Sequence, residues 1–179
     1  MVDDPYERLR KRRIYANAWL AVDVHDIVHA GGVPGEHVVL VTPDPCAVVV
    51  EDGDGLIFAV QPRFAAGRRA IEIVKGGRNP GETALECARR ELREELGLAA
   101  RSWVELGRLY EIPSVVAGPV TLFLARELDR LEAAPEPQEQ IESLRMTVAE
   151  AFDAAASGAI DDAVTIAALF RYGRVRGRL

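Results

Sequence analysis

The chain has few of the features that would stabilise a fold by covalent or metal crosslinks. Its 179 residues include two cysteines, Cys46 and Cys87, and neither stands near a second cysteine or a histidine at zinc-finger spacing. The pattern therefore excludes a disulfide framework and a zinc finger, and we expect a reducing, cytoplasmic compartment. Long apolar runs are also absent, because no window approaches the roughly 18 to 20 residues of a membrane helix. We expect no membrane partner.

Positive charge is in deficit as well. The sequence has 22 Lys and Arg against 28 Asp and Glu, a formal net charge of −6, which argues against binding nucleic acid through an overall positive field. Phosphate chemistry stays open, because it needs only local positive charge or a metal. The segment Met1–Pro5 is acidic and runs into Arg8–Arg13 with no apolar core of signal-peptide length, so we expect a protein that is not exported.

The apolar fraction of 49% in 179 residues is enough for one or two compact domains that bury roughly 70% of the unfolded surface. The first fifteen residues are charged and predict a loose arm or a first helix. After Gly76 the apolar period changes from two to 3.6, which predicts a helix that ends at Gly97. Turns, β-branched residues and alanine-rich segments predict strands at 17–30, 37–41, 46–51, 70–74, 103–110 and 120–127, an exposed loop at 132–139, and helices at 148–156 and 161–172.

This order of elements predicts an α/β sandwich rather than a doubly wound sheet. We expect residues 1–50 to form an N-terminal arm with strands, which would serve as a dimerisation element, and residues 51–179 to form the main domain.

Three carboxylates share one flank of the central predicted helix. Glu91 and Glu95 stand at i and i+4, and Glu91 and Glu94 at i and i+3, spacings at which like charges repel each other. A glutamate-rich helix face is usually just solvated, but a cation among these oxygens would remove the repulsion. Carboxylates without a nearby Cys or His favour Mg²⁺ or Mn²⁺ over zinc, and Mg²⁺ commonly bridges substrate phosphates.

The spacing around these glutamates is more specific than the glutamates themselves. From Gly76, five residues lead to Glu82 and seven more to Arg90-Glu91, followed by Leu92, Glu94-Glu95 and Gly97-Leu98. Every defined position of this pattern resembles the Nudix box, the signature of hydrolases that act on nucleoside diphosphates linked to another group.

The resemblance implies a Nudix-type α/β/α sandwich with a mixed β-sheet and a loop-helix-loop metal site; residues 51–179 would then be the Nudix hydrolase domain. Glu91 and Glu95 match positions that ligate Mg²⁺, and Glu94 matches a further ligand or a base. The backbone carbonyl of Lys75 corresponds to another ligand. Glu82 matches the position that steadies the loop together with Arg90, and Gly97 is a structural position of the motif.

Beyond the box, the stretch Gln61–Ile73 and Pro113 resemble the ADP-ribose pyrophosphatases, which implies cleavage of ADP-ribose into AMP and ribose 5-phosphate. Members of this subfamily are typically homodimers. In this interpretation Arg63, Arg68 or Arg69 contacts phosphate and Glu72 accepts a hydrogen bond from the base or the ribose, while Gly76 lets the backbone approach the bound ligands.

The general base stays open, because Pro137 stands where some members carry a catalytic loop glutamate, and Glu136 and Glu139, which flank it, could substitute. Alternative substrates are a GDP-sugar, a dinucleotide or an oxidised nucleotide. A nucleotide sensor with a Nudix fold and no turnover is the alternative outside the enzymes. We interpret Cys87, which lies on the same helix, as a small filler rather than a nucleophile.

Overall fold

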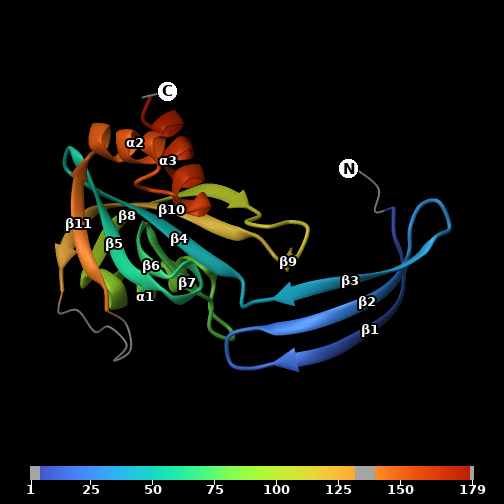
Figure 1. Ribbon diagram of the computed structural model, residues 1–179. Coiled ribbons are helices and arrows are strands. Elements are labelled where there is room, and N and C mark those ends of the chain that lie inside the picture. Colours follow the sequence, from blue (N-terminus) through green and yellow to red (C-terminus); the bar gives the residue numbers. More distant parts are fainter. Residues whose placement is uncertain (1–4, 132–139, 178–179) are drawn as a thin grey trace. The chain divides into compact units, whose positions relative to one another are not determined.

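The computed structural model describes residues 5–131 and 140–177. The chain divides into two compact units, which we describe separately. The first comprises Met1–Pro43 and Tyr110–Pro119, and the second comprises Asp44–Leu109 and Val120–Leu179. The elements of both are labelled in Figure 1.

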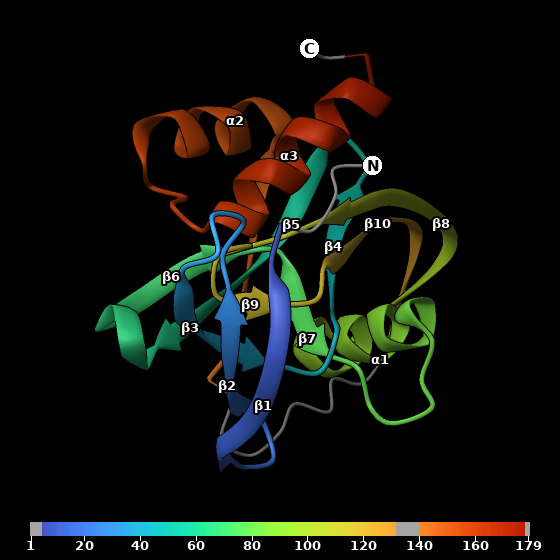
Figure 2. The same cartoon turned by 90° about the vertical axis from the view of Figure 1, so that its right-hand side faces the viewer.

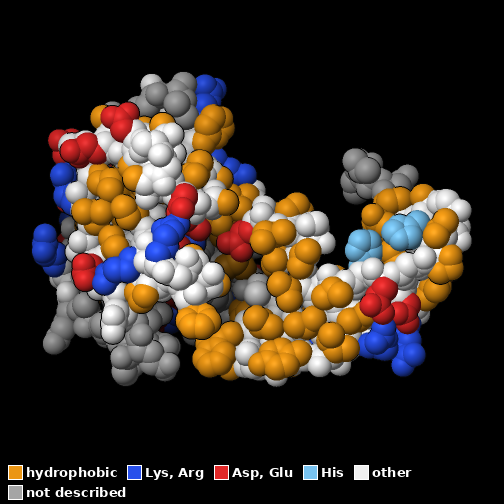
Figure 3. Space-filling view, viewed as in Figure 1, with side chains coloured by type: hydrophobic (Ala, Val, Ile, Leu, Met, Phe, Trp, Pro, Cys, Tyr) orange, Lys and Arg blue, Asp and Glu red, His pale blue; other side chains and the backbone are white. Residues whose placement is uncertain are grey.

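The first unit is a four-stranded sheet in the order β1-β2-β3-β9. Its strands are β1 (Glu7–Ala16), β2 (Ala21–Val28), β3 (Pro34–Val41) and the short β9 (Val116–Ala117). β1, β2 and β3 pair antiparallel, and β9 joins β3 in parallel. Exposed apolar side chains extend along this sheet (Figure 3), among them those of Leu9, Ile14, Tyr15, Trp19, Val33 and Val38.

The prediction of a loose arm or helix over the first fifteen residues is wrong, because Glu7–Ala16 is a strand. Three of its cations, Lys11, Arg12 and Arg13, pair with carboxylates of other strands. Lys11 Nζ and Arg13 Nε lie 2.7 and 2.8 Å from the carboxylate of Asp23, which is fully buried. Arg12 Nη2 lies 3.2 Å from Asp26 and 2.7 Å from Glu36. Ladder hydrogen bonds and cross-strand charge pairs thus outweigh the unfavourable strand propensity of a basic segment.

The second unit contains a seven-stranded mixed sheet with the path β11-β5-β4-β10-β8, and β6 and β7 pair with β5 and β4. β10 runs parallel to β4, whereas the other pairs are antiparallel. The strands are β4 (Pro45–Asp52), β5 (Gly55–Arg63), β6 (Arg68–Glu72), β7 (Val74–Gly77), β8 (Leu98–Leu109), β10 (Val120–Arg130) and β11 (Glu142–Thr147), with a short 3₁₀ turn η1 (Phe64–Ala66) before β6.

Three helices cover the two faces of this sheet. α1 (Ala84–Leu96) lies on one side, and α2 (Val148–Ser157) and α3 (Ala163–Val175) lie on the other (Figure 2). The period-two alternation of β4 sends Ala47 and Val49 into the cluster under α2 and α3, and Cys46, Val48 and Val50 into the cluster under α1. The expected α/β/α sandwich with a mixed sheet is confirmed.

The second unit also follows the local turn signals of the sequence. Asp52 pairs with Gly55 in the hairpin between β4 and β5, and Gly53 has a φ of 62°, as the Asp-Gly sequence predicts. The predicted loop at 132–139 lies outside the described residues. None of the described helices has the length and hydropathy needed to cross a membrane.

Candidate active site

The candidate site is built on the loop that leaves β7 and on α1. Thr83 is the N-cap of α1: its hydroxyl accepts from Glu86 N at 3.2 Å, and its own N–H donates to Glu86 Oε2 at 2.8 Å. At the other end, Gly97 adopts a left-handed conformation with a φ of 62° and caps Leu92 and Arg93. The caps fix where the helix begins and ends, and so fix which residues of the box project from one face.

Arg90 connects the loop to the helix. Its Nε donates to Glu82 Oε1 at 2.8 Å, and its Nη2 donates to Glu82 Oε2 at 3.0 Å and to the Gly77 carbonyl at 2.8 Å. Glu82 also accepts from Asn79 N at 2.8 Å. The hydrogen bond from Arg90 holds the pKa of Glu82 below its usual range, and that same bond raises the pKa of Arg90. The pair therefore stays ionised and clamps the loop.

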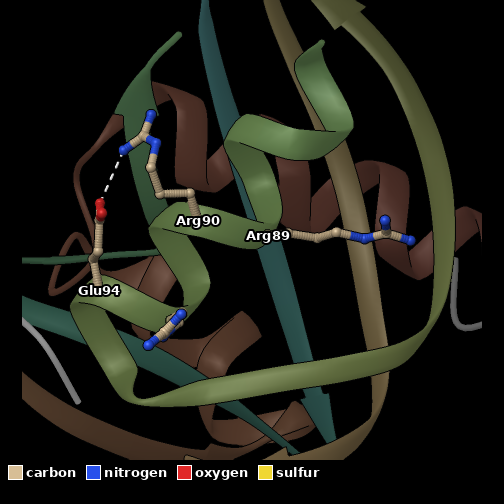
Figure 4. A pocket seen from close by; sticks show the side chains of 4 residues that line it. Arg89, Arg90 and Glu94 are labelled. Carbon is tan, nitrogen blue, oxygen red and sulfur yellow. Dashed lines mark hydrogen bonds and ion pairs between the residues drawn. The ribbon is translucent and has the colours of Figure 1, made fainter. Parts of the chain in front are cut away.

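The same guanidinium draws two of the box carboxylates together. Arg90 Nη1 donates to Glu91 Oε1 at 2.6 Å and to Glu94 Oε2 at 2.9 Å; the contact with Glu94 is drawn in Figure 4. Two acids that would repel each other thus meet at one cationic nitrogen. A divalent cation would compete with Arg90 for the same oxygens.

Glu91 is held closely against the backbone of the loop. A Cβ atom placed on Gly76 would lie 1.9 Å from the Glu91 carboxyl carbon and from its Oε1. Only glycine leaves room for that carboxylate at this position, because real Cβ contacts are never so short. Lys75, whose carbonyl the resemblance assigns to the metal, lies next to it in β7, opposite Ala47 of β4.

The third carboxylate, Glu95, is buried on α1 with 8% of its surface exposed. In the described part of the chain, no three His, Cys, Asp or Glu side chains stand close enough to share a metal ion. The donor set nevertheless fits a hard divalent cation, because it consists of oxygens alone and includes a carboxylate seated in the space that Gly76 leaves.

A second network lies beside the box. Glu72 accepts from Arg63 Nε at 3.0 Å and Nη2 at 2.5 Å, and Lys75 Nζ lies 3.5 Å from Glu72 and 2.8 Å from Asp162. Burial works to lower the pKa of Arg63, but the hydrogen bond to Glu72 and the charges of Glu72, Glu95 and Asp162 outweigh it and raise that pKa. Arg63 therefore lies within electrostatic reach of the box glutamate Glu95.

Asp162 links this network to α3. Its Oδ2 accepts from Thr165 N at 2.8 Å and from the Thr165 hydroxyl at 2.6 Å, and Ile73 N donates to that hydroxyl at 3.1 Å. Burial tends to raise the pKa of Asp162, but the charge and hydrogen bond of Lys75 lower it overall. Sequence reasoning missed Asp162 and Thr165 as site residues. The Asp-x-x-Thr spacing before an apolar run indicates that Asp162 is an N-cap, but it does not indicate that Asp162 pairs with Lys75.

The remaining predicted residues are spread around these two networks. Arg68 pairs with Asp161 and donates to the Arg69 carbonyl at 2.9 Å. Glu136 and Glu139, the candidate bases, lie outside the described residues.

A pocket of 490 Å³ opens on the outer side of α1 (Figure 4). Its lining is three arginines and one acid, Arg89, Arg90, Arg93 and Glu94. Arg90 and Glu94 point toward each other, whereas Arg89 extends away from them. The site thus has local positive charge on a chain that is acidic overall.

Comparison with known proteins places these residues in a family context. The NUDIX domain model matches residues 42–169. An ADP-ribose pyrophosphatase of Bacillus subtilis (strain 168) is 29% identical over 90% of this chain and 89% of its own length. An ADP-ribose pyrophosphatase of Mycobacterium tuberculosis is 30% identical over 76% of this chain and 68% of its own. The crystal structure of an ADP compounds hydrolase has a TM-score of 0.86 at 22% identity and covers 98% of both chains.

Proposed function

The chain belongs to the NUDIX domain family and is a Nudix hydrolase, and from this premise we propose that it cleaves the pyrophosphate bond of a nucleoside diphosphate sugar with the help of Mg²⁺ or Mn²⁺. ADP-ribose is the favoured substrate, with AMP and ribose 5-phosphate as products. The observation that carries the proposal is the convergence of Glu91 and Glu94 on Arg90 Nη1, at 2.6 and 2.9 Å, beside the loop that Glu82 clamps.

Glu91, Glu95 and the Lys75 carbonyl would hold the metal, with Glu94 as a further ligand. When bound, the metal neutralises phosphate charge and lowers the pKa of an attacking water. The chain's own part is to orient these oxygens. Arg90 and Glu82 fix the loop against α1, so that the Lys75–Gly76 backbone is held beside α1 before substrate arrives. Such preorganisation lowers the entropy cost of reaching the reacting geometry.

The substrate's phosphates carry negative charge, and two groups of arginines are available to meet it. Arg63 lies in the network with Glu72 and Lys75, and Arg89, Arg90 and Arg93 line the pocket beside Glu94. We assign phosphate contact to Arg63 and to Arg89 and Arg93 of that pocket, because Arg90 is already bound by Glu82, Glu91 and Glu94. Arg68 already pairs with Asp161. Substrate binding must break that pair before Arg68 can reach phosphate, whereas Glu72 would accept a hydrogen bond from the base or the ribose.

Removal of the water's proton needs a carboxylate with access to the reacting phosphate. Glu94, half-exposed at the edge of the box, is one candidate, and Glu136 and Glu139 are the candidates from the following loop. Variants Glu94→Gln, Glu136→Gln and Glu139→Gln separate them. The base is the residue whose replacement lowers kcat and removes the acidic limb of the pH–rate profile while the Mg²⁺ dependence stays unchanged.

The test of the activity is direct. The protein is incubated with ADP-ribose, a GDP-sugar, a dinucleotide and an oxidised nucleotide, each with Mg²⁺, Mn²⁺ or EDTA, and the products are separated by chromatography. We expect AMP and ribose 5-phosphate from ADP-ribose with metal and none with EDTA. Faster turnover of another substrate would reassign the specificity. Binding without turnover of any of them would identify a nucleotide sensor.

We also propose that the chain is a homodimer. The support is the set of exposed apolar side chains on the first unit, including Trp19 at 73% exposure, Ile14 at 59% and Leu9 at 58%, since a patch of this kind is unfavourable in water unless another surface covers it. Sedimentation equilibrium of the wild type and of the double variant Ile14→Lys, Trp19→Lys tests this proposal. A wild-type monomer at micromolar concentration would refute it.

A further inference from the structure

The two cysteines of the chain meet in the core beneath the candidate site. Cys46 of β4 and Cys87 of α1 stand 41 positions apart in sequence, yet their Sγ atoms lie 2.9 Å from each other. Both residues are free thiols and fully buried, with 0% of their surface exposed. The sequence has no other cysteine, so each has one thiol partner within its own chain.

The pair is built into the contact between α1 and the sheet. Both belong to the apolar cluster that also contains Val48, Ala88 and Leu92. Cys46 stands opposite Gly76 in the ladder of β4 and β7, and Cys87 Sγ donates to the Gly76 carbonyl at 3.6 Å. The sulfurs therefore lie directly below the backbone that seats Glu91.

We propose that Cys46 and Cys87 form a modification site for thiol oxidants, at which a peroxide converts the two thiols into one intramolecular disulfide. Each thiol loses its hydrogen, an S–S bond forms between the two Sγ atoms, and the two electrons and two protons pass to hydrogen peroxide, which leaves as two molecules of water. The bond length of about 2.05 Å requires the sulfurs to approach by roughly 0.9 Å. No third thiol competes, so the disulfide has one possible pairing within the chain.

The crosslink has two consequences for the molecule. It joins β4 to α1 covalently and closes a loop of about 40 residues, which restricts the unfolded chain and stabilises the fold. It also draws α1 toward the sheet one turn before Glu91, whose carboxylate already has no spare room against Gly76. A displacement of this order at a catalytic constellation lowers the rate. The oxidised protein is therefore more stable and less active than the reduced protein.

The experiment compares the wild type after reduction with dithiothreitol and after incubation with hydrogen peroxide. Each sample is denatured, alkylated with iodoacetamide and weighed by intact mass spectrometry. We expect the oxidised chain to lose two hydrogens and take up no alkyl group, and the reduced chain to take up two. Cys46→Ala and Cys87→Ala are the matched controls, because each retains one thiol and cannot form the intramolecular bond.

Thermal unfolding supplies a readout that does not involve activity. The oxidised wild type should melt on the order of 5 to 10 °C higher than the reduced wild type, and dithiothreitol should reverse the shift, whereas peroxide should not raise the melting temperature of either variant. Two alkylatable thiols after oxidation, or covalent dimers only, would overturn the proposal and leave the cysteines as small core fillers. Both readouts use the wild type, so a variant that fails to fold does not weaken the test.

The effect on rate rests on the proposed function and is measured separately. ADP-ribose hydrolysis with Mg²⁺ should fall at least about fivefold in the oxidised protein and return on reduction. An unchanged rate in protein that mass spectrometry shows to be crosslinked would overturn the coupling to the site. If the reduced protein has no activity with any nucleotide, the proposed function is refuted. The disulfide proposal is then still tested by the intact mass and the melting temperature of the oxidised protein.

Discussion

Replacing Gly76 by alanine tests the central geometric claim, that the loop backbone seats a catalytic carboxylate. The new Cβ would lie 1.9 Å from the carboxyl group of Glu91. An ordinary carbon contact needs about 3.4 Å or more, so the carboxylate must move by roughly 1.5 Å and leave its place beside Arg90 Nη1. Misplacement of a catalytic group by about 1 Å can reduce the rate about 10²-fold. We expect kcat/KM for ADP-ribose to fall by about that factor.

The assay is steady-state hydrolysis of ADP-ribose over a range of Mg²⁺ concentrations. Because the displaced carboxylate holds the metal less well, the Mg²⁺ concentration for half-maximal rate should rise together with the loss of kcat. Gly31→Ala is the matched control, since a Cβ there meets nothing within 4 Å and the backbone does not have a positive φ. If Gly76→Ala has the rate and the Mg²⁺ dependence of the wild type, the assignment of Glu91 to the metal is refuted.

Three further outcomes are expected. Glu95→Gln should lose at least about 10²-fold in kcat/KM if its carboxylate holds a catalytic metal; a near-wild-type rate would remove Glu95 from the mechanism. Asp162→Ala removes the N-cap of α3 and the partner of Lys75, and it should lower the free energy of unfolding in a urea titration by about 1 to 2 kcal/mol. The control Asp161→Ala breaks only an exposed pair with Arg68 and should have little effect. Equal losses in the two variants would contradict the role of Asp162. The pKa values of Glu82 and Asp162 are lowered in the folded chain. The stability that these two carboxylates contribute is therefore fully present above the unfolded pKa values near 4 and is lost as the pH falls through the lower folded values. The melting temperature should drop less steeply from pH 5 to pH 3 in Glu82→Gln than in the wild type, and parallel curves would argue against the Arg90 clamp.

The places where sequence reasoning failed share a cause. The segment Glu7–Ala16 has the composition of an exposed arm, and its strand conformation depends on Asp23, Asp26 and Glu36, which lie in other strands. The sequence around Asp162 predicts an ordinary helix cap. Asp162 belongs to the site only because the fold brings Lys75 Nζ within 2.8 Å of its carboxylate. Both are effects of long-range contacts, which local patterns do not encode.

Local and periodic features were determined by the sequence alone. The helix of the box, its end at Gly97 and the spacing of Glu91, Glu94 and Glu95 along it follow from residue type and spacing, because the helix period fixes which side chains share a face. The tertiary structure alone decided that Glu91 fills the space above Gly76 and that Cys46 meets Cys87. These contacts join residues from separate elements, and their distances depend on how the sheet and α1 pack together.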